Sequence, residues 1–199
     1  MRFIDFVGQD PKALQQTQTQ TQTPQKTPNY RAPSITRKYA QKWGPVFAVP
    51  PVWLRTVAFI ESSHNPDKVN MARFDKGGAW GLMQQMADEI DYKIKQIKKT
   101  RAGKTLKVKL TLQKWHGDPQ DLLDPDLNML LAAWQIGRLK ARFKKFDTVI
   151  AAYHQGEYAV RRRIQQGQPV LSPTSHPKGY DYVQRAIVAR NHLLSQQES

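Results

Sequence analysis

Apolar residues recur every three or four positions along most of the chain beyond residue 35, which is the spacing of helices that pack against a core. The longest such pattern follows Asp124. Its apolar and small positions are Leu127, Leu130, Leu131, Trp134, Gly137 and Ala141. Further helices are predicted over residues 35–45, 51–61, 148–153, 157–166 and 180–194, and within residues 79–98. The sequence therefore predicts a mainly α-helical protein.

One of these helices carries an acidic residue, Glu61, at its end. Pro51 suits the first turn of this helix, and Pro66 disfavours the helical conformation at the residue before it. Val57 and Ile60 lie on the apolar stripe beside Glu61. We therefore expect Glu61 to project from the last turn and to border a buried face.

A shorter stretch, residues 106–112, alternates apolar and polar residues, which is the period of a β-strand with one polar face. Ala102-Gly103 would form the turn before it. The surrounding residues 92–115 are strongly basic. We expect a basic hairpin here, or a helix followed by a strand, and we favour contact with a polyanion over a merely solvated face.

The first 34 residues have a different composition. A Gln/Thr alternation follows Leu14, and turn-forming residues around Pro33 close it. Such a tract cannot bury enough apolar surface to offset the entropy of ordering, so we interpret residues 1–34 as a disordered or extended tail. The alternative is a β-strand that pairs with a partner chain. A short apolar patch within residues 3–7 could dock onto another surface. The globular domain then covers residues 35–199.

The net charge narrows the range of partners. The chain has 199 residues, of which 31 are Lys or Arg and 16 are Asp or Glu, giving a formal net charge of +15. This surplus predicts an anionic partner, such as nucleic acid, an anionic membrane surface or an acidic polymer. The absence of cysteine excludes a disulfide framework and a thiolate metal site. No apolar stretch is long enough for a transmembrane helix, and the start of the sequence lacks the apolar core of a signal peptide.

A glycine-rich segment, residues 77–84, follows the helix that carries Glu61. Glycine lets the backbone approach a ligand closely. A carboxyl group at an apolar wall has its neutral form favoured, and a general acid needs that form. A lone glutamate at a helix end is usually only a solvated charge, but the neighbouring loop favours the catalytic interpretation.

Several short motifs follow one another with characteristic spacing. They are Glu61-Ser62-Ser63, Asn65-Pro66, Gly78-Ala79-Trp80-Gly81-Leu82-Met83-Gln84, Asp124-Pro125 with Asn128, Ala151-Ala152-Tyr153, and Tyr182-Val183. In this order they resemble the soluble lytic transglycosylase (SLT) domain, a goose-type lysozyme-like helical fold that cleaves peptidoglycan. The resemblance spans about residues 52–189. It implies a mainly α, lysozyme-like domain with a small β insertion and a disordered N-terminal tail.

The resemblance also implies a mechanism in which Glu61 makes both proton transfers. Glu61 protonates the glycosidic oxygen between MurNAc and GlcNAc. It then acts as base on the MurNAc 6-hydroxyl, which attacks C1 and closes a 1,6-anhydro ring. The N-acetyl group of the substrate stabilises the charge at C1, so a second carboxylate is not required, unlike in the usual glycosidase. No cofactor is implied.

The same resemblance assigns substrate contacts to the glycine-rich segment and to a later helix. Gln84 is expected to hydrogen-bond a sugar from the cleft wall, with a surface amide as the alternative. Met83 is expected to pack under the sugar, although a methionine in isolation is more often part of a core. Tyr153 is expected to line the cleft, and core packing is the alternative.

Three further residues are expected around the acid. Ser62 would hold Glu61 or the N-acetyl group of the substrate, and a local bond at the helix end is the alternative. Tyr182 would donate its phenol to Glu61, with Tyr180 as the competing candidate. His154 stands where the family usually has Asn, and we expect either a substrate contact or a surface histidine.

The sequence departs from the family at other places as well. Residues 85–87 (Gln-Met-Ala) replace a proline-containing turn, and residues 155–157 (Gln-Gly-Glu) replace a run of small residues. The basic residues 91–118 look like an insertion. These departures concern the floor of the cleft and one side of the domain, and they leave the acid in place.

We expect no metal site, because the histidines lack paired ligand spacing and no cysteine supports them.

Peptidoglycan is the expected partner, and the basic surface and the tail could also contact DNA or other virion proteins. The charge and the start of the sequence lead us to expect a phage particle that opens the host wall as DNA enters. The alternatives are a structural or DNA-binding module that keeps the fold, and a muramidase that uses water. For the latter, Asp75, Asp88, Glu89 or Glu157 would position the water.

Overall fold

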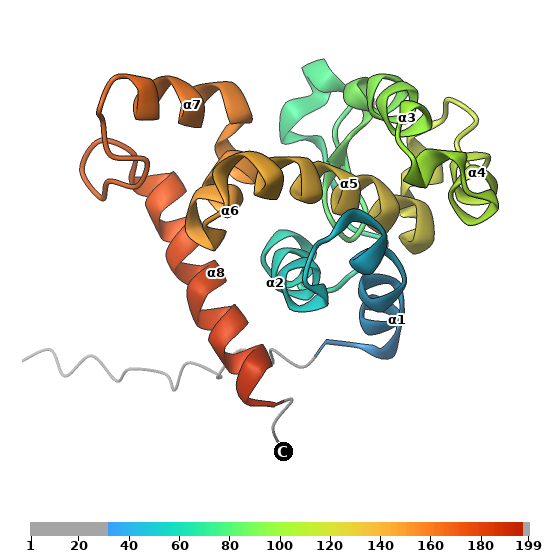
Figure 1. The fold of residues 1–199 in the computed structure, drawn as a ribbon, viewed down its shortest axis with the longest axis horizontal. Coiled ribbons are helices and arrows are strands. Elements are labelled where there is room, and N and C mark those ends of the chain that lie inside the picture. The colour runs from blue at the N-terminus through green and yellow to red at the C-terminus, as the bar shows by residue number, and fades with distance from the viewer. Residues whose placement is uncertain (1–31, 197–199) are drawn as a thin grey trace, which may run out of the picture.

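The structure is a computed structural model that describes residues 32–196, apart from the side chains of residues 73–75. The tail expected over residues 1–34 lies almost wholly outside the described residues. Within them, the chain is mainly helical, as the sequence predicts (Figure 1). The α-helices are α1 (Ser34–Trp43), α2 (Pro51–Ser62), α3 (Ile90–Lys99), α4 (Leu106–Leu112), α5 (Pro125–Phe143), α6 (Phe146–Gln155), α7 (Glu157–Gln165) and α8 (Pro177–Ser195). Short 3-10 turns are η1 (Pro45–Phe47), η2 (Met71–Lys76), η3 (Ala87–Glu89), η4 (Ala102–Lys104) and η5 (Pro119–Leu123).

Helix α5 runs through the middle of the molecule (Figure 1). Helices α1, α3, α4 and α6 pack against it, while α8 packs against α2 and α6. The side chains of Leu127, Leu130 and Leu131 on α5 are fully buried and Trp134 is nearly so, as the helical spacing of the sequence predicts. Ala141, which the same spacing placed in the core, is exposed. The core therefore surrounds α5, and α2 carries Glu61 along its border.

The ends of α5 and α8 show how local chemistry sets helix boundaries. Asp124 precedes α5, and its side-chain Oδ1 accepts hydrogen bonds from the backbone N–H groups of Asp126 (2.9 Å) and Leu127 (2.8 Å). This is an N-cap, which satisfies amide groups that have no partner inside the helix. Helix α8 begins at Pro177, earlier than the predicted start at Tyr180, because proline is well suited to the first helical turn.

A small sheet holds the glycine-rich segment. Strand β1 (Val69–Asn70) pairs antiparallel with β2 (Ala79–Trp80), and β2 pairs antiparallel with β3 (Gln85–Met86). The loop between β2 and β3 contains Gly81 and Gln84. The sheet thus fixes both ends of this loop opposite the end of α2.

The strand expected over residues 106–112 is wrong, because these residues form helix α4. The helix buries Val108 and Leu112, which lie four residues apart, while Leu106 and Leu110 are 70 % and 54 % exposed. The alternation predicted that all four apolar residues would share one buried face. Two of them instead face outward, so the alternation was not a sign of a strand, and the small β element lies outside the basic segment.

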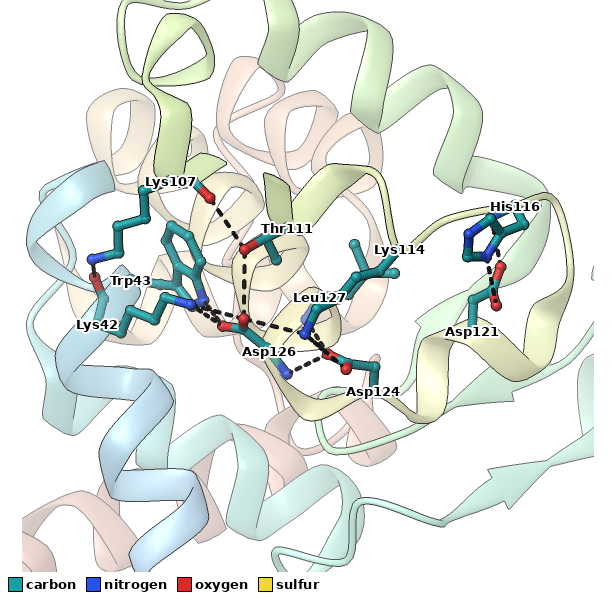
Figure 2. Close-up of polar contacts among 10 residues, drawn as sticks. All are labelled: Lys42, Trp43, Lys107, Thr111, Lys114, His116, Asp121, Asp124, Asp126 and Leu127. Atoms are coloured by element: carbon teal, nitrogen blue, oxygen red, sulfur yellow. Dashed lines mark hydrogen bonds and ion pairs between the residues drawn. The ribbon is translucent and has the colours of Figure 1, made fainter. Parts of the chain in front are cut away.

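A buried carboxylate connects α4 to the core (Figure 2). Asp126 accepts hydrogen bonds from the Nε1 of Trp43 (2.8 Å) and the Nζ of Lys42 (2.7 Å) on α1. On the other side, Lys114 Nζ and Thr111 Oγ1 lie 3.3 and 3.4 Å from the Asp126 Oδ2. One buried side chain therefore joins α1, α4 and α5.

Candidate active site

Glu61 occupies the last turn of α2, as the sequence predicts. The helix ends because Ser63 and His64 adopt left-handed backbone conformations, with φ of 54° and 66°. The side chain of Lys68 folds back and donates a hydrogen bond to the backbone carbonyl of Glu61. The carboxyl group is thereby held at the border of the core, and its side chain is neither fully buried nor freely solvated.

The glycine-rich loop lies close to α5. Gly81 has a φ of +73°, and a Cβ atom at this residue would lie 2.3 Å from the Leu122 carbonyl oxygen and 2.5 Å from the Asn128 Nδ2. Both the conformation and the space therefore require glycine. Asn128 fastens the loop, since its Oδ1 accepts from the Met83 N–H (2.8 Å) and its Nδ2 donates to the Trp80 carbonyl (2.8 Å).

The loop and α2 border a cleft of about 340 Å³. Four of the residues singled out from the sequence line it, and they come from α2, the glycine-rich loop and α6. They are Glu61, Gln84, Tyr153 and His154. Residues separated by almost a hundred positions in the sequence are thus brought to one hollow. The cleft is narrow and largely polar, a shape that suits a chain of sugars better than a flat aromatic ligand.

The pKa of the Glu61 carboxyl is raised above its ordinary value because burial penalises the charged form. A hydrogen bond from Tyr182 opposes this effect, as do the positive charges of Lys68 and Arg185. The Tyr182 hydroxyl donates to Glu61 Oε1 at 2.5 Å, which is the contact that the resemblance implied. Of the two candidate tyrosines it is therefore Tyr182, not Tyr180, that contacts the acid.

His154 stacks on the same tyrosine. The rings of His154 and Tyr182 lie 4.0 Å apart between centroids and 10° from parallel. Burial, together with the positive charge of Arg185, lowers the pKa of His154, so the imidazole is neutral near pH 7. His154 thus lines the cleft and also supports the phenol that contacts Glu61.

Two of the residues expected to contact the substrate, Met83 and Ser62, are buried and do not line the cleft. Met83 is fully buried, with its backbone carbonyl accepting from the Tyr153 hydroxyl at 2.7 Å. Ser62 is buried, and its hydroxyl donates to the Ala58 carbonyl at 2.9 Å. This is the local bond that was left open as an alternative. Neither side chain lines the cleft, so their contact with a sugar stays a prediction.

A polar network in the lining of the cleft was missed from the sequence. Lys93 Nζ donates to the Gln85 Oε1 (3.0 Å), and the Gln85 Nε2 donates to the Tyr153 hydroxyl (2.8 Å). Lys93 also makes an ion pair with Glu89 (2.9 Å). Burial lowers the pKa of Lys93, while the charge of Glu89 acts in the opposite direction. A signal was present, because Lys93 lies on the same helical stripe as Ile90, Ile94 and Ile97, yet is polar.

The other carboxylates are poorly placed for a second catalytic role. Glu89 lines the cleft but is paired with Lys93. Glu157 is held by Arg138 and Arg142, at 2.5 and 2.9 Å. Asp88 does not line this cleft, and the side chain of Asp75 lies outside the described residues. Among the described side chains, Glu61 is the cleft carboxyl without an ion pair.

Among residues 32–196 with described side chains, no group of three or more His, Asp or Glu is arranged to hold a metal ion. The same part of the chain contains no helix that is long and apolar enough to cross a membrane.

In a comparison with protein-family models, residues 38–170 match the transglycosylase SLT domain. The match covers about two thirds of the chain and includes Glu61, the glycine-rich loop and His154. Tyr182 lies beyond it. A search of curated proteins gave no match.

Proposed function

Since the chain belongs to the transglycosylase SLT domain family and is therefore a lytic transglycosylase that acts on peptidoglycan, we propose that it cleaves the β-1,4 bond between MurNAc and GlcNAc and leaves a 1,6-anhydroMurNAc end. The observation that carries this finer proposal is that Glu61, among the described side chains, is the cleft carboxyl group without an ion pair and has its pKa raised by burial. A raised pKa favours the protonated form of Glu61, which can give its proton to the leaving sugar.

The proposed reaction uses Glu61 twice. In the first step, protonated Glu61 gives its proton to the glycosidic oxygen as the bond from that oxygen to C1 of MurNAc breaks. In the second step, the resulting carboxylate takes the proton of the MurNAc 6-hydroxyl, whose oxygen forms the new bond to C1. Glu61 ends in its starting, protonated state, so no water is consumed. General acid–base catalysis of this kind contributes roughly 10²–10⁴-fold.

Neighbouring residues would orient the acid and the sugar. Tyr182 donates to one carboxyl oxygen of Glu61 and would keep the other directed at the glycosidic bond. Gln84 lines the cleft with its amide nitrogen bonded to the backbone carbonyls of Lys68 and Gly81, so its amide oxygen would accept from a sugar. His154 and Tyr153 would form the facing wall. Met83 would hold Tyr153 through its backbone carbonyl, and Ser62 would hold the end of α2 that carries Glu61.

Digestion of purified peptidoglycan with the wild-type protein and with Glu61→Gln tests the proposal. We expect the wild type to release muropeptides that are lighter by one water than the reducing forms, and the variant to release none. The amide is nearly isosteric, so thermal melting should show a folded variant. Retained release of the same products by Glu61→Gln would refute the assignment of the acid.

The closest competing activity is hydrolysis by water in the same cleft. Hydrolysis with a second carboxylate would require an acidic group that is free to position the water. Glu89 is the candidate that lines the cleft, and its ion pair with Lys93 argues against this role. Reducing-end products from the wild type would favour the hydrolase, and a further loss of these products in Glu89→Gln would identify its second carboxylate.

We further propose that the protein is carried by a phage particle and opens the wall locally as DNA enters. The support is the surplus of basic residues, which suits a protein that meets DNA as well as peptidoglycan. Mass spectrometry of purified particles, together with peptidoglycan digestion by intact particles, tests this setting. Absence of the protein from the particles would refute it and favour a role in the cell that makes it.

A further inference from the structure

One side of the molecule carries a dense group of positive charges. Residues 92–113, which form most of α3, the turn η4 and α4, contain no aspartate or glutamate. Six exposed cations in this stretch make no ion pair or side-chain hydrogen bond with any residue that the structure describes. They are Lys95, Lys98, Lys99, Arg101, Lys104 and Lys109. We call this surface the basic face.

Two carboxylates beside this stretch, Asp124 and Asp126, are already engaged by other side chains (Figure 2). Asp126 is occupied by Lys42 and Trp43, and Asp124 is bound by Lys114 at 2.8 Å. Asp91, at the start of α3, accepts from the indole of Trp115 at 2.8 Å. The acidic groups around the basic face thus hold α4 and the Trp115 loop in place, and the lysines that face outward stay uncompensated.

The basic face is also hollowed. A shallow cavity of about 630 Å³ lies between η4 and α4, with Lys98, Lys104 and Lys109 among the residues that line it. Gly103, Leu112, Gln113 and Trp115 complete its lining. A negatively charged group that enters this cavity would meet three ammonium groups above a partly apolar floor.

We propose that the basic face is a binding site for the phosphate backbone of nucleic acid, with the cavity between η4 and α4 as its centre. Duplex DNA carries one negative charge for about every 1.7 Å of its axis, and each lysine that neutralises a phosphate releases a bound counterion. The uncompensated cations of the basic face can neutralise several such closely spaced phosphates at once.

This site is separate from the peptidoglycan cleft. None of the lysines around the cavity lines the cleft, and the cleft residues of α3 and the preceding turn are Lys93 and Glu89. The protein could therefore hold DNA and wall polymer at the same time. The proposal does not depend on the reaction that Glu61 catalyses.

Fluorescence anisotropy with a labelled, mixed-sequence DNA duplex tests the site. The test variant is Lys98→Gln/Lys104→Gln/Lys109→Gln, which removes the cations around the cavity. The matched control is Lys38→Gln/Lys144→Gln/Lys145→Gln, which removes the same formal charge from exposed lysines on α1 and at the junction of α5 and α6. Thermal melting of all three proteins checks that each is folded.

We expect the test variant to bind the duplex on the order of 100-fold more weakly at about 0.1 M salt, and to lower the slope of log K against log salt by about 2–3. The control should change both quantities much less. Equal weakening in the two variants would overturn the proposal, because it would show a diffuse effect of net charge. Absence of duplex binding by the wild type at low salt would overturn it as well.

Binding to whole peptidoglycan sacculi separates the two classes of polymer. This arm uses the Glu61→Gln background so that the sacculi stay intact. If the test variant loses sacculus binding while the wild type ignores DNA, the basic face belongs to wall attachment and the proposal is wrong. If sacculus binding persists in the test variant while duplex binding is lost, the nucleic-acid assignment stands.

Discussion

The carboxyl group of Glu61 is subject to two opposing effects. Burial raises its pKa and favours the acid form, whereas the hydrogen bond from Tyr182 stabilises the charged form and moderates that rise. Both forms are needed in a reaction where one group is first an acid and then a base. The tyrosine therefore adjusts the acid as well as orienting it.

Removing the Tyr182 hydroxyl should shift the pH dependence in a defined direction. Tyr182→Phe deletes a bond to the charged form, so the pKa of Glu61 rises further. The free enzyme needs protonated Glu61, so kcat/KM falls as pH rises through this pKa, and the fall should move to higher pH in the variant. We also expect kcat to drop about tenfold, because a hydrogen bond to a charged group stabilises by about 1.5–3 kcal/mol.

The pH profile of muropeptide release measures both effects. Tyr180→Phe is the matched control, because the structure gives Tyr180 no contact with Glu61. A profile that shifts to lower pH in Tyr182→Phe, or shifts equally in the control, would contradict this account of the hydrogen bond.

Lys93 is the residue whose importance the sequence concealed. Lys93→Met keeps the length of the side chain and removes the donor to Gln85, which in turn holds Tyr153. An unpaired buried acceptor costs about 1–3 kcal/mol, part of which is offset because a buried charge is also removed. We expect a folded protein with a modestly lower melting temperature and a kcat reduced more than KM is changed.

Lys95→Met makes the same chemical change at an exposed position of the same helix and should leave kcat unchanged. Steady-state kinetics on both variants tests this prediction. If kcat changes equally in the two variants, the hydrogen bonds from Lys93 through Gln85 do not position Tyr153.

At the scale of elements, α4 shows where sequence patterns fail. The sequence of residues 106–112 fits a strand with alternating faces, and it also fits a helix that buries Val108 and Leu112. The tertiary contacts decided for the helix, because Thr111 can then reach Asp126 and Lys107 can donate to the Lys42 carbonyl at 3.2 Å. Long periodic segments such as α5 were predictable because their spacing admits one conformation over many turns.

The candidate site was predictable to the extent that short motifs encode it. Glu61, Gln84, Tyr153 and His154 were named from the sequence and share one cleft. The buried lysine network was not, since Lys93 and Gln85 carry no motif, and the contacts from Lys93 to Gln85 and from Gln85 to Tyr153 arise only when α3, β3 and α6 are brought together. Sequence spacing encodes neighbours within one element, and contacts between elements depend on the fold.

The junction of α1, α4 and α5 should depend on the charge of Asp126. Burial alone would raise the pKa of this carboxyl, but hydrogen bonds from Lys42 and Trp43 and the charge of Lys114 lower it overall below 3.8. Asp126→Asn leaves these donors without their charged partner, so we expect the free energy of unfolding at pH 7 to fall by about 2–4 kcal/mol. Urea denaturation measures the loss.

The pH dependence supplies a second, independent check on Asp126. A carboxyl whose pKa is depressed by folding adds stability above its unfolded pKa of about 4, and this stability is lost as pH falls through the lower, folded pKa. The difference in the free energy of unfolding between wild type and Asp126→Asn should therefore narrow below about pH 4. Asp67 is exposed and has no side-chain partner in the described structure. Asp67→Asn should therefore have the same free energy of unfolding as the wild type across this pH range. A difference between wild type and Asp126→Asn that stays constant in acid would contradict the ionic role of Asp126.

At the scale of the whole molecule, the core, the cleft and the basic face are all built from residues 32–196. Each of these parts depends on α5, against which α1, α3, α4 and α6 pack. Residues 1–31 lie outside the described part, and their Gln/Thr-rich composition is what leads us to expect a tail that the core does not need. Folding and wall cleavage should therefore be properties of the described residues alone.

Deletion of residues 1–31 tests this division of the chain. We expect the shortened protein to keep its melting temperature to within a few degrees, because the Gln/Thr-rich composition of the deleted residues leaves little apolar surface to bury on folding. Muropeptide release and the salt slope of DNA binding should also persist, since Glu61 and the lysines of the basic face remain. A large drop in melting temperature would show that the apolar patch within residues 3–7 packs on the domain. Loss of wall cleavage at an unchanged melting temperature would instead place part of the substrate site in the deleted segment.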